Sequence, residues 1–228
     1  MNNIPSQSTY DAFNSLIFSD NLSILAKLIA RKQMLELVKD IPGDVVELGV
    51  FKGSGLATFL KLKDIMFPKI CSMKVIGFDF FNTEALIDSL QGNDKKEMES
   101  LFIDRKFKHE NSFLNSLSQT FKTMGYTEQD YELVKGDVNI TVSEFIKQRP
   151  GFRARLVYFD LDLEEPTYNA LNALWDKVSP GGVVVFDEAG LHQWSESNGI
   201  DKFFAGKNLK LTSTNLPCPT AYIVKPNF

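Results

Sequence analysis

Acidic residues follow several apolar segments of this chain, each at the point where the segment gives way to a turn. The segments have the β-branched and aromatic composition that is typical of buried strands. In an open α/β sheet, ligands bind at the edge formed by the carboxyl ends of the parallel strands. The sequence therefore predicts an acidic ligand site at that edge. The acidic residues concerned are Glu47, Asp79, Asp160, Asp162, Asp187 and Glu188.

A glycine-rich turn follows the first of these segments. Gly49, Gly53 and Gly55 let the backbone bend tightly and approach a ligand closely. The turn lacks the lysine of the phosphate-binding loop, and Thr58 stands where a dinucleotide-binding turn has its last glycine. Glu47, two residues before Gly49, would repel a pyrophosphate and attract an ammonium group. These features favour a cofactor with an amino-acid moiety over a dinucleotide.

Asp79 ends the second apolar segment, where a carboxylate can accept one ribose hydroxyl on each oxygen. Together with Glu47 and Gly49, it suits a ligand with an amino acid at one end and a nucleoside at the other. S-adenosylmethionine has that shape, and we expect Gly53 and Ser54 in its binding turn. The structural alternative is that Glu47 and Asp79 are surface carboxylates without a ligand.

Strands alternate with helices along most of the chain, which predicts a largely parallel, three-layer α/β fold. The last two strands are joined by a turn, so we expect an antiparallel pair at the sheet edge. The expected helices cover residues 20–39, 56–66, 142–148, 166–177 and 199–204. The expected strands cover residues 45–48, 74–78, 131–135, 156–159, 183–186, 209–213 and 221–224.

Two parts of the single expected domain, residues 1–228, stand outside this alternation. Residues 1–40 are predicted to form an N-terminal helical segment, with Leu22, Leu28 and Ile29 on its apolar side. Residues 81–129 are charged and rich in phenylalanine, with helical spacing. Because connections in such folds are usually short, this length indicates a helical cap or lid; a helix pair that merely covers the sheet is the alternative.

The composition restricts the class of protein. The chain has 228 residues, 43% of them hydrophobic, which suffices for one sizeable core. A net charge of -4 without a basic block argues against a nucleic-acid partner. No stretch has the roughly 20 apolar residues of a membrane span, and the start lacks a secretory signal, so we expect a cytoplasmic protein. Cys71 and Cys218 are far apart and are expected to behave as small apolar residues.

The motifs resemble the macrocin O-methyltransferase family of sugar methyltransferases. The resemblance rests on Pro42–Gly53, Gly77-Phe-Asp-Phe-Phe81, Phe159-Asp-Leu-Asp-Leu163 and Ser179–Glu188. It implies a Rossmann-like class I methyltransferase fold, with a mostly parallel seven-stranded sheet, an antiparallel C-terminal strand and helices on both faces. It also implies that Phe80, Asp160 and the pair Gly136-Asp137 take part in cofactor binding, with Asp137 beside the adenine.

The resemblance further implies a divalent metal, usually Mg²⁺, held by Asp160, Asp187 and Glu188. The family often has two aspartates at the last pair, where this chain has Asp-Glu. Oxygen ligands suit Mg²⁺, and Asp162 is a competing ligand because it faces the same side if the strand persists. The alternative is that these acids cap helices or form ion pairs.

The predicted activity is methyl transfer from S-adenosylmethionine to a hydroxyl of a small molecule, and the expected small molecule is a sugar or nucleotide sugar. Asp160 would hold the metal, and His192 would act as the base; a surface or helix-capping role for His192 is the alternative. Trp194 and Glu196 are expected to line the acceptor pocket. A nicotinamide-dependent oxidoreductase and a non-catalytic S-adenosylmethionine-binding protein are the competing hypotheses, and a homo-oligomer is left open.

Overall fold

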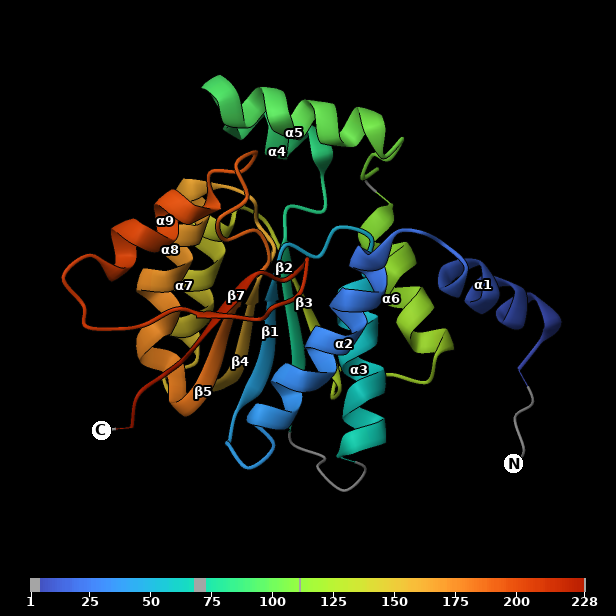
Figure 1. Cartoon of the computed structure of the whole chain (residues 1–228), viewed down its shortest axis with the longest axis horizontal. Coiled ribbons are helices and arrows are strands. Elements are labelled where there is room, and N and C mark those ends of the chain that lie inside the picture. The colour runs from blue at the N-terminus through green and yellow to red at the C-terminus, as the bar shows by residue number, and fades with distance from the viewer. Residues whose placement is uncertain (1–4, 68–72, 111, 228) are drawn as a thin grey trace.

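The computed structural model describes residues 5–67, 73–110 and 112–227, so Cys71 lies outside the described residues. A seven-stranded sheet with the order β3-β2-β1-β4-β5-β7-β6 runs through the molecule (Figure 1). Neighbours from β3 to β5 pair in parallel, whereas β7 pairs antiparallel with β5 and with β6. The predicted mostly parallel sheet is confirmed. Its strands are β1 (Asp44–Leu48), β2 (Val75–Asp79), β3 (Tyr131–Lys135), β4 (Ala154–Phe159), β5 (Val178–Phe186), β6 (Thr212–Ser213) and β7 (Ala221–Val224).

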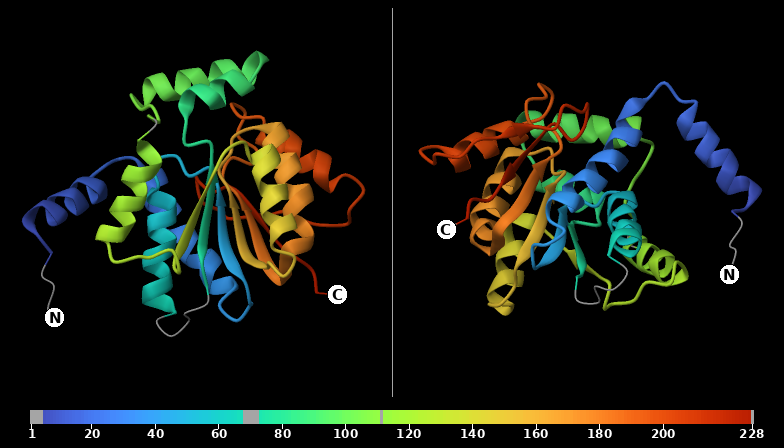
Figure 2. Two further views of the ribbon diagram at one scale, coloured as in Figure 1. Left: turned by 180° about the vertical axis from the view of Figure 1, so that it is seen from behind. Right: turned by 60° about the horizontal axis from the view of Figure 1, so that its bottom comes forward.

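Helices cover both faces of this sheet (Figures 1 and 2). One face packs α2 (Leu22–Leu37), α3 (Ser54–Met66) and α6 (Phe113–Thr123) against the strands in a shared apolar cluster. The other face packs α7 (Val138–Gln148), α8 (Glu164–Leu174) and α9 (Glu196–Phe204) in a second cluster. The parallel strands β1 and β4 are therefore buried on both sides, which explains their continuous apolar sequences.

The expected cap region, residues 81–129, has two parts with different surroundings. The helices α4 (Thr83–Ser89) and α5 (Gly92–Asp104) lie above the carboxyl edge of the sheet (Figure 1). By contrast, α6 buries Leu117 and Phe121 in the apolar cluster beside α3. The part of this region that lies over the predicted site is therefore α4 with α5.

The N-terminal segment also has two parts. Helix α1 (Gln7–Ile17) has no buried residue and projects from the body of the molecule (Figure 1). Helix α2 is buried along a face that starts with Ala26, Ala30 and Arg31. The expected apolar side is wrong in this half of the helix, since Leu22 is 66% and Ile29 42% exposed. The helix instead turns Arg31 towards the sheet, where Arg31 forms an ion pair.

Local sequence signals explain where the elements begin and end. Asp137 accepts a hydrogen bond from the Asn139 amide, so it caps α7 four residues earlier than expected. Pro166 lies in the first turn of α8, where a missing amide is tolerated. The 3₁₀ turn η1 (Trp175–Lys177) follows α8. The expected strand 209–213 is shorter than predicted, because only Thr212–Ser213 pair with β7. Within the described ranges, no helix combines the length and apolarity needed to span a membrane.

Candidate active site

Four parallel strands end beside one another at the carboxyl edge. The Gly49 amide donates to the Phe78 carbonyl, and the Asp160 amide donates to the Leu48 carbonyl. The Asp187 amide in turn donates to the Phe159 carbonyl. These bonds join the ends of β2, β1, β4 and β5 in sequence. The residues that follow the strands therefore form one continuous edge, as the sequence predicts.

The turn after β1 requires glycine at its first position. Gly49 has a φ of +89°, and a Cβ atom there would lie 1.9 Å from the Asp160 carbonyl oxygen. Gly53 has a φ of +85° and is the N-cap residue of α3. Ser54, the first residue of α3, is exposed. The turn thus lies close against the strand that carries Asp160.

Asp79 holds this turn in place. Its Oδ2 accepts hydrogen bonds from the Val50 and Phe51 amides, both at 2.9 Å, and its Oδ1 accepts from Phe81 at 2.8 Å. A carboxylate offers about four acceptor positions, two on each oxygen. One position on Oδ1 therefore stays free for a ribose hydroxyl. The sequence predicts that each Asp79 oxygen accepts one ribose hydroxyl. Oδ2 could do so only if the turn released the Val50 or the Phe51 amide.

Glu47 lies beneath the turn and not in it. Its side chain is buried, and Oε1 accepts a hydrogen bond of 2.8 Å from Arg31. The Arg31 guanidinium also lies over the rings of Tyr158, at 4.5 Å from the centroid, and Phe59, at 5.4 Å. Burial raises the pKa of Glu47, although the Arg31 charge opposes that change. The charge that was expected to attract a ligand ammonium is thus paired with Arg31 inside the protein.

An acidic cluster lies at the ends of β4 and β5, with a lysine in its centre. The Lys27 ammonium of α2 is 2.6 Å from Asp187 Oδ2 and 3.4 Å from Asp160 Oδ2. Asp162 Oδ1 and Glu188 Oε2 are buried and have no hydrogen-bond partner among the described residues. The cluster therefore contains more carboxylate oxygens than its own side chains satisfy. Its members are Asp160, Asp162, Asp187, Glu188 and Glu196.

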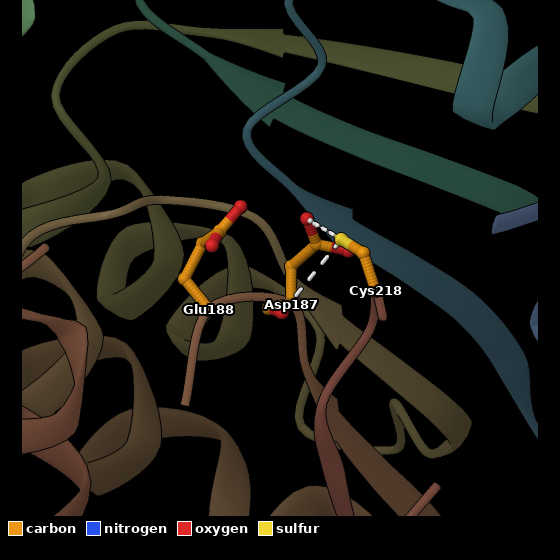
Figure 3. A group of neighbouring side chains, drawn as sticks. All are labelled: Asp187, Glu188 and Cys218. Carbon is orange, nitrogen blue, oxygen red and sulfur yellow. Dashed lines mark hydrogen bonds between the residues drawn. The ribbon is translucent and has the colours of Figure 1, made fainter. Parts of the chain in front are cut away.

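Asp187 is the most connected member of this acidic cluster. It accepts hydrogen bonds from the Tyr158 hydroxyl at 2.5 Å and from the Cys218 thiol at 2.9 Å, in addition to Lys27. Figure 3 shows the sulfur against the Asp187 carboxylate and Glu188 beside it without such a bond. Ligand atoms of Asp187, Glu188 and Cys218 lie within 4.8 Å of one another. In this group Cys218 takes the place expected for Asp160, which is joined to Asp187 through Lys27.

Burial and mutual repulsion shape the charges of the acidic cluster. Burial, followed by the charges of its acidic neighbours, raises the pKa of Asp162 to about 7 and that of Glu188 to about 8. Burial and the Asp187 charge also raise the pKa of Asp160. Burial acts on Asp187 too, but the Lys27 charge and the hydrogen bonds from Cys218 and Tyr158 lower its pKa overall. Asp187 is thus the carboxylate that stays ionised, while a further cation would favour ionisation of the others.

A cleft of about 710 Å³ adjoins the acidic cluster below α5. His192 and Trp194 both line this cleft. Glu196 is wrongly predicted as a lining residue, because it is fully buried and accepts a hydrogen bond from the Glu188 amide. Ser195 joins the two walls of the cleft: its hydroxyl donates to Asp94 of α5 at 3.0 Å. The cleft is lined by Gln91, Asn93, Asp94, Glu164, Gly190, Leu191, His192, Gln193, Trp194, Ser195, Ser197 and Asn198.

The remaining predicted residues lie along the same edge. The Gly136 amide donates to the Asp79 carbonyl, which brings the end of β3 to the turn. The Asp137 carboxylate is used by the α7 cap, so its predicted contact with an adenine competes with that bond. Phe80 is half-buried directly after Asp79. His109, in contrast, is buried, and its Nε2 lies 2.7 Å from the Phe51 carbonyl oxygen, which fits a structural role.

The acidic cluster fits a divalent cation of the hard, oxygen-preferring kind. A cation already lies between Asp160 and Asp187, since the Lys27 ammonium contacts both. The unpartnered buried oxygen of Glu188 supplies a further acceptor. Carboxylate oxygens are the ligands that Mg²⁺ prefers, usually together with several waters.

Comparison with protein families identifies the chain. The model of the family described as macrocin-O-methyltransferase (TylF) matches residues 25–216. The chain belongs to the macrocin-O-methyltransferase family. This result confirms the resemblance seen in the sequence motifs, and the match includes the glycine turn, α5 and the acidic cluster.

Individual relatives agree with this assignment. The 8-demethyl-8-(2,3-dimethoxy-alpha-L-rhamnosyl)-tetracenomycin-C 4'-O-methyltransferase of Streptomyces olivaceus is 28% identical over 156 residues, or 67% of this chain. The match spans 55% of that relative, so the chain corresponds to about half of its length. The crystal structure of the calicheamicin methyltransferase CalS11 has a TM-score of 0.78 and 26% identity, over 97% of this chain and 87% of that chain.

A more distant structure shows the fold alone. The methyltransferase PaMTH1 of Podospora anserina, solved with S-adenosylhomocysteine, has a TM-score of 0.56 at 10% identity and covers 100% of both chains. Together with the strand order, this likeness confirms the predicted Rossmann-like class I methyltransferase fold.

Sequence reasoning missed Lys27, Arg31 and Cys218. The two basic residues are four positions apart, so they share one face of α2 with the buried Met34 and Leu35. The sequence did contain a signal for Lys27 and Arg31, because both have the same helical spacing as the apolar residues of the buried face. Cys218 gave none, because it is 31 residues from Asp187 and lies in a loop.

Proposed function

We propose that this protein is an S-adenosylmethionine-dependent O-methyltransferase that acts on a hydroxyl of a sugar or nucleotide sugar. The observation that carries the proposal is the placement of the acidic cluster between a glycine turn and a polar cleft, on one edge of the sheet. Membership of the macrocin-O-methyltransferase family supports methyl transfer over hydride transfer. The sugar methyltransferases among its relatives support a sugar acceptor.

The methyl donor is proposed to lie over the glycine turn. The free acceptor position on Asp79 Oδ1 would bind a ribose hydroxyl, and the exposed Ser54 at the start of α3 would lie near the amino-acid end. Gly49 and Gly53 let the turn pack closely against the Asp160 carbonyl and the Leu117 side chain, where a Cβ atom would collide. Phe80, Gly136 and Asp137 border the nucleoside end. S-adenosylmethionine supplies an activated methyl group when it is bound.

Mg²⁺ is the proposed metal, held by Asp160, Asp187 and Glu188, with Asp160 also facing the methyl donor. When bound, the ion would orient neighbouring acceptor hydroxyls and lower the pKa of one of them. Glu188 is longer than the aspartate common in the family, and its unpartnered oxygen is free to serve as a ligand. The buried Tyr158 hydroxyl and Cys218 thiol orient Asp187 from behind.

The acceptor is proposed to enter through the cleft below α5. Its polar lining of Gln91, Asn93 and Asn198 suits the hydroxyl groups of a sugar, and the Trp194 ring offers an apolar face for a sugar ring. His192 is the proposed base that takes the hydroxyl proton while the oxygen attacks the methyl carbon. Asp162 is a second candidate, because its buried Oδ1 has no other partner.

Calorimetric titration with S-adenosylmethionine tests the proposal directly. Because Asp79 also anchors the turn, Asp79→Ala would disturb binding through the backbone as well. Asp79→Asn is the better variant, since the amide oxygen still accepts from the turn while the charge is lost. We expect about tenfold weaker binding, the lower end for a hydrogen bond to a charged group. Asp88→Asn on the exposed side of α4 is the matched control.

Two outcomes separate the competing hypotheses. If folded wild-type protein does not bind S-adenosylmethionine, the methyltransferase proposal is wrong. If it binds but transfers no methyl group to any glycoside or nucleotide sugar, with or without Mg²⁺, the protein is a non-catalytic binder. Transfer that His192→Ala leaves unchanged and Asp162→Asn abolishes would assign the base to Asp162.

A further inference from the structure

Lys27 occupies the point at which a cation would bind the acidic cluster. Its ammonium contacts Asp187 Oδ2 at 2.6 Å and Asp160 Oδ2 at 3.4 Å, so the two carboxylates already share one positive charge. Both carboxylates belong to the set proposed above for Mg²⁺. Lys27 and the Cys218 thiol occupy both acceptor positions of Asp187 Oδ2, so a metal ion can bind this oxygen only after one of them leaves.

This lysine does not satisfy all the carboxylate oxygens of the acidic cluster. Five carboxylates converge here, and among the described residues Lys27 is the cation within ion-pair distance of them. Arg31, the next basic residue along the same helix face, is already paired with Glu47. Glu188 Oε2 and Asp162 Oδ1 keep unpartnered buried oxygens. A divalent ion would satisfy this excess better than a single ammonium.

Lys27 is also placed so that it can leave. Its side chain is 30% exposed, whereas that of Asp187 is fully buried, so part of the Lys27 side chain is in contact with water. A lysine has a flexible four-carbon stem and a strongly hydrated charge, and it regains that hydration when it moves into water.

We propose that Lys27 is a resident counter-ion, which holds the cation position of the acidic cluster and must be displaced before a divalent metal binds. This inference rests on the metal site of the proposed function. Lys27 therefore sets the metal affinity: it stabilises the metal-free protein and weakens the apparent binding of the ion. It acts as a positioning residue for Asp160 and Asp187.

The test measures metal binding without turnover. Mn²⁺ is titrated into metal-free wild type, Lys27→Met and Lys27→Gln, and free Mn²⁺ is followed by electron paramagnetic resonance. We expect both variants to bind Mn²⁺ at least about tenfold more tightly than wild type. The reason is that the charged contacts of Lys27 with Asp160 and Asp187 no longer compete with the metal ion for these carboxylates. Lys32→Met is the control: Lys32 lies on the same helix and pairs with Glu36 at the surface, so its affinity should equal that of wild type.

Thermal unfolding provides the second readout. Lys27→Met should melt below wild type in chelator, and Mn²⁺ should raise its melting temperature more than that of wild type. Equal or weaker Mn²⁺ binding by both Lys27 variants would overturn the inference, as would a loss of stability that Mn²⁺ does not restore. S-adenosylmethionine titration of the same samples keeps the proposals apart. Donor binding without tighter metal binding refutes the role of Lys27 alone, whereas absence of donor binding refutes the proposed function.

Discussion

The buried ion pair between Arg31 and Glu47 makes the sharpest prediction for stability. Both side chains are almost inaccessible, at 6% and 2% exposure, and they join α2 to β1 directly below the glycine turn. A Cβ atom on Gly55 would lie 1.9 Å from Glu47 Oε1, so the pair fills the space under the start of α3. Arg31→Met removes the charge and keeps much of the aliphatic volume.

The expected loss of stability follows from the uncompensated charge. Removing one partner of a buried ion pair typically costs about 3–5 kcal/mol, because the other charge stays buried. For a domain of this size, that loss lowers the melting temperature by roughly 10 °C. Glu47→Gln in the same chain removes the isolated charge. The double variant should therefore be more stable than Arg31→Met alone, with a coupling of about 2 kcal/mol.

Urea unfolding of the four proteins in the cycle measures this coupling. Arg149 and Glu132 provide a matched control at the surface, since they lie 2.7 Å apart and Arg149 also covers an aromatic ring, that of Phe145. Arg149→Met should cost less than about 1 kcal/mol, as exposed pairs do. A similar small loss for Arg31→Met, or strict additivity in the double variant, would refute the reasoning.

Three further predictions concern the site and the N-terminus. Asp162 and Glu188 keep protons in the folded protein up to pH of about 7 and about 8, because burial and neighbouring charges raise their pKa. The free energy of unfolding of the metal-free protein should therefore fall as pH rises from about 5 to 7, by about 1 kcal/mol per pH unit for each of the two groups. Saturating Mg²⁺ should make the melting temperature depend less on pH. Gly49→Ala should cost about 2 kcal/mol or more in urea unfolding, because of the positive φ and the Asp160 carbonyl. Deleting residues 1–18 should change the melting temperature by less than about 2 °C, because α1 has no buried residue; sedimentation of the two forms measures the oligomeric state, which the sequence leaves open.

The parallel sheet and the acidic edge were predictable because their signals are local. A buried strand is a run of apolar residues, and the residue after it must lie at the carboxyl edge. Val75 to Phe78 before Asp79, and Val183 to Phe186 before Asp187, carry that information within a few positions. The turn at Gly49 was predictable from its glycines, which are a local signal. The Asp160 carbonyl, which excludes a side chain at Gly49, lies far away in the sequence.

The partners of these acids were not predictable in the same way. Lys27 is 133 residues from Asp160, and no local pattern encodes which cation meets which carboxylate after folding. Leu22 and Ile29 also made α2 look buried on the wrong side, because apolar periodicity does not say which apolar face the sheet covers. Tertiary placement of the helix decides both points.

Helix α2 therefore belongs to the candidate site as much as the strand ends do. Lys27 and Arg31 lie one turn apart on the inner face of this helix. Lys27 forms an ion pair with Asp187, and Arg31 forms one with Glu47. The two ion pairs differ in how accessible their basic residue is to solvent. Arg31 is buried between Glu47 and the rings of Phe59 and Tyr158, so no ligand can reach its charge without a rearrangement of the core. The Lys27 side chain is partly exposed, so its charge is the one that a metal ion could replace, and the two positions on the helix differ in role.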